Sequence, residues 1–270
     1  MTIDEYAALE LRLGARLIRV GEVWWRRVRP FFYRPLLCYE LLDEACLKPP
    51  VGCLGAFQYA VTDPAVSNST INYLVLDRLQ EYDVTKLGRR KRQLLNQATR
   101  TFTVREINEP EELKSGAYPV YVSFYKRSGY TYLRQRRRKP DFDRWVDIIF
   151  DFGRPFVLGG YEGNELKGVS VSYRLMDTVI YATLFVETEA LKKNLGELML
   201  HELRVRAAEE EGVKQVFLRP YHGANSQDRY YMHRGARLVR QPARLHVHPM
   251  VLALLRMVSP QHHAALVGNW

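Results

Sequence analysis

The sequence predicts an α/β fold of the α+β kind, in which a mixed, twisted sheet is flanked by helices. Three strand patterns follow one another closely between residues 155 and 187, and the tight-turn pair Gly163-Asn164 separates the first two. An amphipathic helix pattern over 195–212 comes next, ended by Gly212, and is followed by a return strand near 215–218. Because consecutive elements are usually adjacent in space, we expect the third strand and the return strand to be neighbours.

The first segment, residues 1–33, is predicted to be a basic amphipathic helix. Thr2 and Glu5 have the spacing of a capping box, and apolar residues recur at helical spacing from Leu9 to Val28. Five arginines lie beside that apolar stripe. The helix either packs the stripe onto the domain or lies on a membrane surface with its arginines toward lipid phosphates, and we favour packing.

The next segment, residues 34–115, is predicted to be a smaller unit of short strands and one basic helix. A strand over 71–77 precedes the helix, which runs from about Thr85 to Ala98 and leads into the strand pattern TFTVREI. The stretch 108–119 contains Pro and Gly and is predicted to be a linker. The third segment, 116–270, begins with two helix patterns and continues into the sheet.

The charge of the chain predicts attraction to polyanions. The formal net charge is +10, and two runs concentrate it, Gly88–Arg92 and Arg134–Lys139. Each run is either a solvated face or a surface for an anionic membrane or a nucleic acid. No signature of a known nucleic-acid-binding fold accompanies them.

Several classes are excluded by simple patterns. No apolar run approaches the roughly 20 residues that a membrane-spanning helix needs, and the acidic start MTIDEY is unlike a signal peptide, so we expect a cytoplasmic protein. Cys38, Cys46 and Cys53 lack the paired spacing of a zinc or redox site and are expected to be reduced thiols. The C-terminal histidines have no Cys or acidic companions, so no metal site is predicted. These histidines are His246, His248, His262 and His263.

The segment between the third strand and the long helix has the order of a phosphate site. Unpaired N–H groups and the helix dipole converge where a helix begins just after a strand. The segment resembles the acyl-CoA core of the GNAT acyltransferase superfamily, whose pattern runs from a strand-ending Val through an Arg and a Gly-rich turn into a Leu-rich helix. Val186, Asn194-Leu195-Gly196 and Met199-Leu200 fall on that pattern.

Two positions depart from the family pattern. Leu191 stands at the Arg position, and Asn194 replaces the first turn glycine, although Asn tolerates a positive φ better than other non-glycine residues. The resemblance implies that backbone N–H groups of the turn hold the phosphates of acyl-CoA, which would be a co-substrate rather than a tightly bound cofactor. The expected donor contacts are Val186, Lys192, Lys193, Asn194, Leu195, Gly196, Glu197 and Asn225.

The resemblance also implies catalytic candidates. Asn225, Tyr231 and Gly235 follow the family order in which a Tyr serves as general acid for the departing thiolate. The alternative for Tyr231 is an aromatic ring that packs a short helix against the sheet. Glu187 is the carboxylate nearest to the end of the third strand and is the candidate base, with an exposed charge at the start of the turn as its alternative.

The layout of most of the chain resembles the Fem-type peptidoglycan aminoacyltransferases, which pair two GNAT-like units. The first unit here would be incomplete, because 34–109 contains no recognisable phosphate turn. The resemblance implies an N-acyltransferase that moves an acyl or aminoacyl group from a CoA thioester or an aminoacyl-tRNA to an unidentified amine. The alternative is a non-catalytic binding module on a degenerate GNAT fold, which binds nucleic acid or a membrane surface.

Overall fold

The computed structural model of the chain describes residues 1–43, 47–48, 50, 56–129, 134–152, 155–221, 223 and 225–267, without the side chains of 262 and 265. The chain forms two compact units. Unit 1 consists of Met1–Leu9 and Leu76–Phe217, and unit 2 consists of Glu10–Val75 and Leu218–Trp270. This division differs from the sequence-based one into 1–33, 34–115 and 116–270, which stays a prediction.

Unit 1 is built on a mixed sheet in the order β7-β8-β9-β10-β11. Neighbouring strands are antiparallel except β10 and β11, which pair in parallel over three residues, from Thr178↔Gln215 to Ile180↔Phe217. The predicted mixed α/β fold and the predicted neighbouring strands are therefore confirmed. The strands are β7 (Thr103–Glu106), β8 (Phe156–Glu162), β9 (Glu165–Leu175), β10 (Thr178–Val186) and β11 (Gln215–Pro220).

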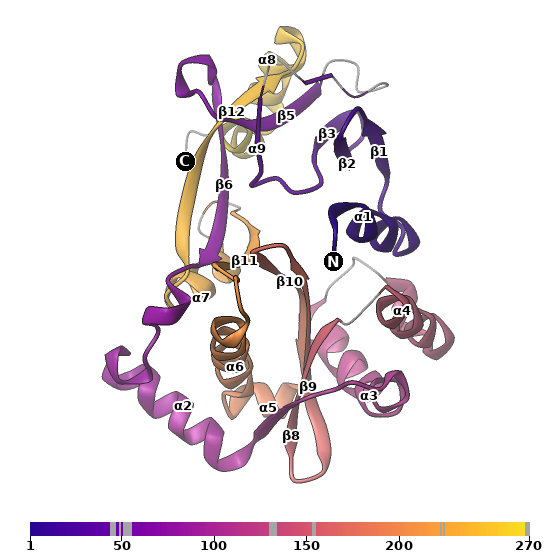
Figure 1. Cartoon of the computed structure of the whole chain (residues 1–270), viewed down its shortest axis with the longest axis vertical. Helices are drawn as coiled ribbons and strands as arrows, with labels where there is room; N and C mark the ends of the chain where they lie inside the picture. Colours follow the sequence, from indigo (N-terminus) through magenta and orange to yellow (C-terminus); the bar gives the residue numbers. More distant parts are fainter. Residues whose placement is uncertain are drawn as a thin grey trace. The chain divides into compact units, whose positions relative to one another are not determined.

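Helices cover both faces of this sheet (Figure 1). One face packs against α6 (Leu195–Glu209), which in turn contacts α2 (Arg89–Thr101). The other packs against α3 (Pro110–Ser128), which is paired with α4 (Lys139–Asp151). The long helix begins at Leu195 as the sequence predicts. Its inward-facing residues are fully buried, namely Leu195, Met199, Leu203 and Ala207. Short 3₁₀ turns occupy Leu79–Glu81, Val84–Lys86 and Arg134–Arg137.

The predicted linker over 108–119 is wrong, because α3 begins at Pro110 and continues through Pro119. The start has the usual signals of a helix N-terminus, with Pro in the first turn beside two glutamates. Leu113, Ala117 and Val120 then recur at helical spacing and are buried. That packing outweighs the helix-breaking tendency of the Gly and Pro on which the linker prediction depended.

Unit 2 contains a second sheet path in the order β1-β2-β3-β5-β12-β6, with β4 also paired to β5. The ten-residue strand β12 has an antiparallel partner on each edge, β5 and β6. Trp25 is fully buried and packs edge-on against Phe57 and Tyr59. The strands are β1 (Leu17–Val20), β2 (Val23–Arg29), β3 (Phe32–Pro35), β4 (Leu41–Leu42), β5 (Ala56–Val61), β6 (Ser69–Leu76) and β12 (Arg237–His246), and Pro64–Val66 forms a 3₁₀ turn.

The predicted helix over 1–33 is wrong beyond its first ten residues. Helix α1 (Ile3–Arg12) begins with the predicted capping box, since Thr2 and Glu5 exchange hydrogen bonds. The chain then turns at Gly14 and Gly21, both with positive φ, and forms β1 and β2. Branched and aromatic residues such as Val23 fill these strands, and such residues favour sheets. The long basic helix on which a membrane-surface role depended is therefore absent.

The C-terminal part of unit 2 carries three helices, α7 (Ser226–Met232), α8 (Pro249–Val258) and α9 (Pro260–Val267). The end of α9 is fixed to the sheet, because the Leu266 carbonyl accepts hydrogen bonds from Gln58 Nε2 at 3.2 Å and from Ser69 Oγ. Within the described ranges, none of the helices has the length and apolar character needed to cross a membrane.

Candidate functional site

Strand β10 is irregular where the predicted site begins. Its register with β9 shifts between Tyr181 and Thr183, so Ala182 is an extra residue in a β-bulge. Pairing with β11 ends at Ile180. From Tyr181 to Val186, β9 is the one strand among the described residues that pairs with β10, and the other edge of β10 stays outside the ladder.

The turn into α6 adopts the geometry that the Asn at its start allows. Asn194 is left-handed, with φ 68° and ψ 24°, and its side chain does not cap the helix. Its Nδ2 instead donates to Gln97 Oε1 of α2 at 3.2 Å. The Asn194 carbonyl accepts from the N–H groups of Glu197 and Leu198. The N–H groups of Leu195 and Gly196 have no acceptor among the residues that the structure describes.

Two glycines allow the start of α6 to press onto the sheet. A Cβ at Gly160 of β8 would lie 2.7 Å from Leu195 Cδ1, and one at Gly168 of β9 would lie 2.9 Å from Leu195 Cδ2. A larger residue at either position would force the fully buried Leu195 side chain to shift. Sequence reasoning missed this pair, since a strand glycine shows its use only when its neighbour is known.

The two predicted phosphate-binding lysines are engaged in ion pairs. Lys192 Nζ lies 2.8 Å from Glu189 Oε1, and Lys193 Nζ lies 2.6 Å from Glu162 Oε1. All four side chains are at least one-third exposed, and exposed pairs contribute little free energy. A ligand phosphate could therefore exchange for either carboxylate at small cost.

Glu187, the candidate base, is bound by a lysine. Lys167 Nζ lies 3.0 Å from Glu187 Oε2 and 2.8 Å from Glu165 Oε2. Hydrogen bonds from Lys167 to Glu165 and Glu187 raise the pKa of Lys167. The Glu187 N–H also donates to the Lys167 carbonyl at 2.8 Å. Glu187 is thus a salt-bridged carboxylate at the end of β10, and accepting a substrate proton requires that it release Lys167.

Two residues of α3 hold the end of β10 in place, and sequence reasoning missed both. Arg127 Nη1 donates to the Val186 carbonyl at 2.9 Å and to Thr188 Oγ1 at 3.3 Å. Ser123 Oγ accepts from the Thr188 N–H at 3.3 Å, at the start of the short helix α5 (Thr188–Lys192). Burial lowers the pKa of Arg127. The available signal was their i, i+4 spacing, which puts both polar groups on one helix face.

Asn225 and Tyr231 lie at the two ends of α7 in unit 2, so the predicted acid and the predicted donor turn belong to different compact units. Asn225 Oδ1 caps α7 by accepting from the Asp228 N–H at 2.8 Å. Tyr231 is only 6% exposed, and burial raises the pKa of its phenol. The phenol therefore stays protonated at neutral pH, as a proton donor must. Arg219 Nε lies 3.6 Å from the fully buried Asp228 Oδ1.

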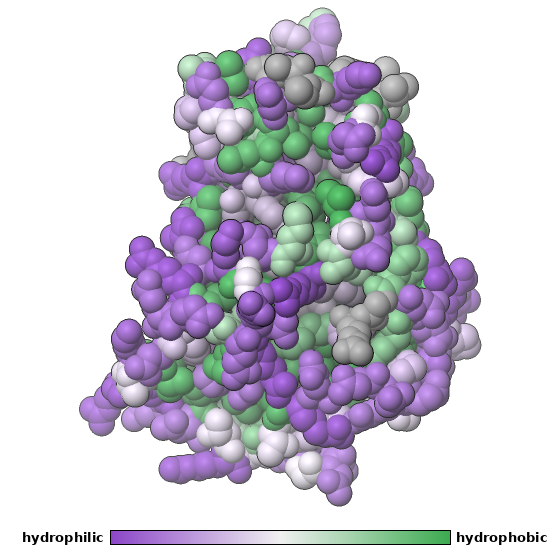
Figure 2. Space-filling view, viewed as in Figure 1, coloured by the Kyte–Doolittle hydropathy of each residue, from purple (hydrophilic) through white to green (hydrophobic). Residues whose placement is uncertain are grey.

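Helix α2 presents a basic surface beside the donor turn. Arg89, Arg90, Arg92 and Arg100 are exposed, and none has a carboxylate partner among the described residues. Hydrophilic side chains dominate the surface over α2 (Figure 2). The Gln97–Asn194 hydrogen bond joins this helix to the start of α6, so unneutralised positive charge lies close to the turn.

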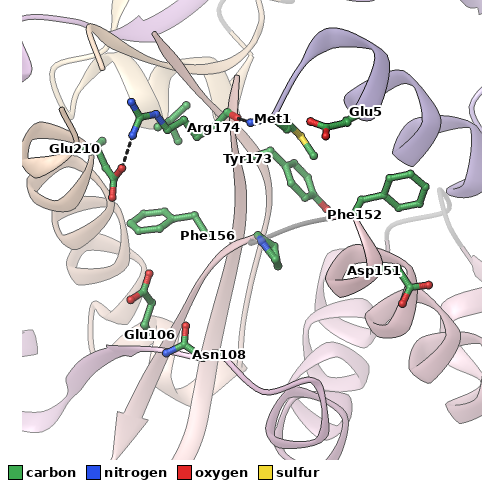
Figure 3. Close-up of a pocket in the computed structure, with 13 residues that line it drawn as sticks. Met1, Glu5, Glu106, Asn108, Asp151, Phe152, Phe156, Tyr173, Arg174 and Glu210 are labelled. Atoms are coloured by element: carbon green, nitrogen blue, oxygen red, sulfur yellow. Dashed lines mark hydrogen bonds and ion pairs between the residues drawn. The ribbon is translucent and has the colours of Figure 1, made fainter. Parts of the chain in front are cut away.

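A cavity of about 710 Å³ lies within unit 1, away from every predicted site residue (Figure 3). It opens near the C-terminal end of α6, at Ala207 and Glu210, whereas the donor turn is at the N-terminal end of that helix. A 15-residue helix separates its ends by about 20 Å. Glu5, Glu106, Asp151 and Glu210 line the cavity together with Met1 and with Arg174, which is ion-paired to Glu210 at 2.6 Å.

His246, His248 and Cys38 have structural surroundings. His246 stacks on Phe57 at 4.4 Å, and His248 caps α8. Burial raises the pKa of Cys38 to about 11. Cys46 and Cys53 lie outside the described residues, as does the side chain of His262. In the part of the chain that the structure describes, no three His, Cys, Asp or Glu residues gather as metal ligands would.

Solved structures share the fold of this chain. The C-terminal DUF2156 domain of a protein described as a lysylphosphatidylglycerol synthetase from Agrobacterium fabrum has a TM-score of 0.65 at 10% identity, over 98% of this chain and 93% of that one. FemX has a TM-score of 0.59 at 10% identity, over 95% of this chain and 94% of FemX. A tandem GNAT protein from the clavulanic acid biosynthesis pathway has a TM-score of 0.49 at 12% identity, over 89% of this chain and 86% of that protein. No protein-family model and no curated protein matches the sequence.

The chain has a GNAT-like fold with the layout of the Fem-type proteins, which confirms the resemblance seen in the sequence. At 10% identity the likeness is one of fold.

Proposed function

We propose that this chain is an N-acyltransferase, which moves an acyl or aminoacyl group from a CoA thioester or an aminoacyl-tRNA to an amine. One observation carries the proposal: beyond the bulge, β10 pairs with β9 alone among the described strands, and the short helix α5 leads from its end to the N–H groups of Leu195 and Gly196, which have no acceptor among the described residues. An extended donor arm can add to an open strand edge, while its phosphate meets the helix N-terminus.

The donor would bind in two parts. Its phosphates would contact the turn at Asn194–Glu197, with Lys192 and Lys193 exchanging their carboxylate partners for the ligand. Its acyl arm would run along β10 from Val186 back toward the bulge at Ala182. Strand N–H groups outside the ladder can polarise the reacting carbonyl there. Arg127 supports this placement because it holds the end of the strand in one position.

The charge on α2 supports a donor rich in phosphate. Four exposed arginines without described carboxylate partners lie on a helix that is hydrogen-bonded to the turn. Both an aminoacyl-tRNA and CoA offer phosphates to such a surface, and the tRNA would cover more of it. The acceptor amine is not identified by these contacts.

The transfer would proceed by direct attack of the amine on the donor carbonyl. Glu187 would take the ammonium proton after releasing Lys167. The candidate acid from the sequence is Tyr231, whose buried phenol keeps its proton at neutral pH. The new amide bond forms as the thioester or ester bond breaks, so no further reactant is needed.

A matched pair of substitutions at Asn194 tests the donor turn. Asn194→Gly keeps the left-handed backbone at no steric cost, whereas Asn194→Val opposes it because β-branched residues rarely adopt a positive φ. We expect donor affinity to be kept or improved in the first and to fall about 10-fold in the second. Isothermal titration with acetyl-CoA and with charged tRNA measures this. Equal affinities for the two variants would contradict a phosphate site at this turn.

A second pair tests the acid. Tyr231→Phe keeps the ring and removes the proton donor, so the maximal rate should fall by about 10- to 1000-fold while donor affinity barely changes. Tyr230→Phe is the matched control, since Tyr230 is the adjacent, half-buried tyrosine. Donor consumption with a mixed amine panel is the assay. An unchanged rate in Tyr231→Phe would leave that residue with a packing role.

The alternative is a binding module without catalysis, which the missing Arg and Gly of the family turn favour. Thermal unfolding separates the two proposals, because a specific ligand raises the melting temperature by mass action. Stabilisation by acyl-CoA or charged tRNA together with donor consumption supports the enzyme. Stabilisation by uncharged tRNA alone, without turnover of any donor, supports the module.

A further inference from the structure

Helix α8 in unit 2 exposes an apolar face. It contains a single charged residue, Arg256, and none of its residues is buried. The exposed fractions of its large apolar side chains run from 53% to 75%. These side chains are Met250, Val251, Leu254, Met257 and Val258, and their spacing of i, i+1, i+4, i+7 and i+8 gathers them into one stripe.

This arrangement is the reverse of an ordinary surface helix, which turns its polar face to water. The opposite side of α8 is apolar as well, with Leu252 and Leu255 half-buried. The helix is nevertheless firmly placed, because β12 precedes it and α9 follows it. The end of α9 is hydrogen-bonded to Gln58 and Ser69 of the sheet. The exposed stripe therefore belongs to a fixed element of unit 2.

The C-terminal segment of the sequence that contains α8 carries charge of one sign. From Arg229 to Trp270 the sequence contains six arginines and neither Asp nor Glu. One of them, Arg256, is exposed on α8 itself. A helix that exposes an apolar stripe and an arginine and contains no acidic residue is complementary to an anionic lipid headgroup layer.

We propose that α8 docks unit 2 on an anionic phospholipid bilayer, with its apolar stripe in the region between headgroups and acyl chains. The ten-residue helix is about 15 Å long, half of a hydrocarbon core, so it lies in the surface and does not span it. Protein interfaces are enriched in aromatic residues, whereas α8 has none. A bilayer needs no specific partner side chain and accepts a stripe of flexible aliphatic groups.

Vesicle binding tests the proposal with the full chain. We expect it to co-sediment with vesicles of phosphatidylglycerol and phosphatidylcholine and to bind pure phosphatidylcholine vesicles at least about 10-fold more weakly. Leu254→Ser with Met257→Ser should reduce binding to the anionic vesicles by about 10-fold or more, since two buried apolar groups are lost. Arg256→Gln should reduce it about fivefold at low salt and less at high salt.

A matched control is Met176→Ser, which removes an equally exposed apolar side chain from the β9–β10 turn of unit 1 and should leave vesicle binding unchanged. All the changed side chains are exposed, so circular dichroism and melting temperature should match the wild type. The proposal is overturned if the wild type binds no anionic vesicles, or if Leu254→Ser with Met257→Ser binds them equally well. It is also overturned if sedimentation velocity finds a dimer that this double variant dissociates, because α8 would then be an interface between copies.

Discussion

The two basic runs, Gly88–Arg92 and Arg134–Lys139, are nearly alike in composition but are used differently in the structure. The first forms the start of α2, where its arginines point into solvent. The second is bound to aromatic rings. The Arg136 guanidinium lies 4.7 Å from the centre of the Trp145 ring, and Arg137 lies 5.1 Å from that of Tyr125.

The surroundings of each run decide its use. Residues Arg134–Lys139 face the aromatic cluster of α3 and α4, and Arg138 and Lys139 also pair with aspartates of α4. The first turn of α2 has no acidic residue, although a helix N-terminus favours acidic side chains. The arginines at the start of α2 therefore lower the stability of the helix slightly. Such a cost is expected where a surface binds an anion.

The largest effect should come from the first run. We expect the triple variant Arg89→Gln, Arg90→Gln and Arg92→Gln to bind bulk tRNA about 100-fold more weakly at low salt. The slope of log K against log salt concentration should become shallower by about two to three. The melting temperature should stay equal or rise, since the change removes like charges from a helix N-terminus. Filter binding at several salt concentrations measures both quantities. A loss of stability with unchanged tRNA binding would show that the first run has a structural role and does not bind an anion.

The second run should show the opposite behaviour. Arg136→Gln with Arg137→Gln removes two cation–π contacts and should lower the free energy of unfolding by about 2 kcal/mol, as urea denaturation would show. Binding of tRNA should change much less than in the α2 variant. A double variant as stable as the wild type would mean that this run is a solvated face after all.

Arg34 of β3 is in a third kind of environment, different from those of the two basic runs. Arg34 of β3 is half-buried and lies over the Phe32 ring at 5.5 Å, without a hydrogen bond or ion pair to any described residue. Burial lowers its pKa. Arg34→Met should therefore raise the free energy of unfolding by about 1 kcal/mol, because an unpaired charge becomes an apolar side chain of similar length. Destabilisation by this change would mean that packing of the Arg34 guanidinium outweighs its desolvation.

The sequence predicted the parts of the fold that local patterns determine. The Gly163-Asn164 turn, the capping box at Thr2 and the start of α6 after Asn194 all follow from the chemistry of a few adjacent residues. The residues that place the end of β10 were not predicted, because Arg127 meets Val186 only through the packing of α3 on the sheet.

The errors have a common physical cause. Apolar residues between Leu9 and Val28 fit a helical period, yet Gly14 and Gly21 allow turns that let the same residues form strands. The stretch after Asn108 contains Gly and Pro, yet Leu113 and Ala117 are buried and keep it helical. In both segments tertiary packing, which a local pattern does not show, decided between two locally acceptable structures.

The smallest predicted effect concerns one more arginine on an aromatic ring. Arg204 of α6 lies 4.1 Å from the centre of the Tyr82 ring, and the Tyr82 hydroxyl is 2.9 Å from His201 Nδ1. Burial, and secondarily the charge of Arg204, lower the pKa of His201 below its ordinary value. The unfolded chain therefore binds this proton more readily than the folded chain does. The contribution of His201 to stability is complete above about pH 6.5 and falls as the pH drops below it.

A variant isolates this titration from the rest of the protein. His201→Asn places a neutral side-chain oxygen near the position of Nδ1, where it can still accept from Tyr82. We expect the loss of unfolding free energy between pH 7.5 and pH 5.5 to be smaller in this variant than in the wild type, by less than about 1 kcal/mol. Urea denaturation at the two pH values measures the difference. An equal loss in both proteins would show that His201 is protonated in the folded state as easily as in the unfolded chain, despite its burial and the neighbouring arginine.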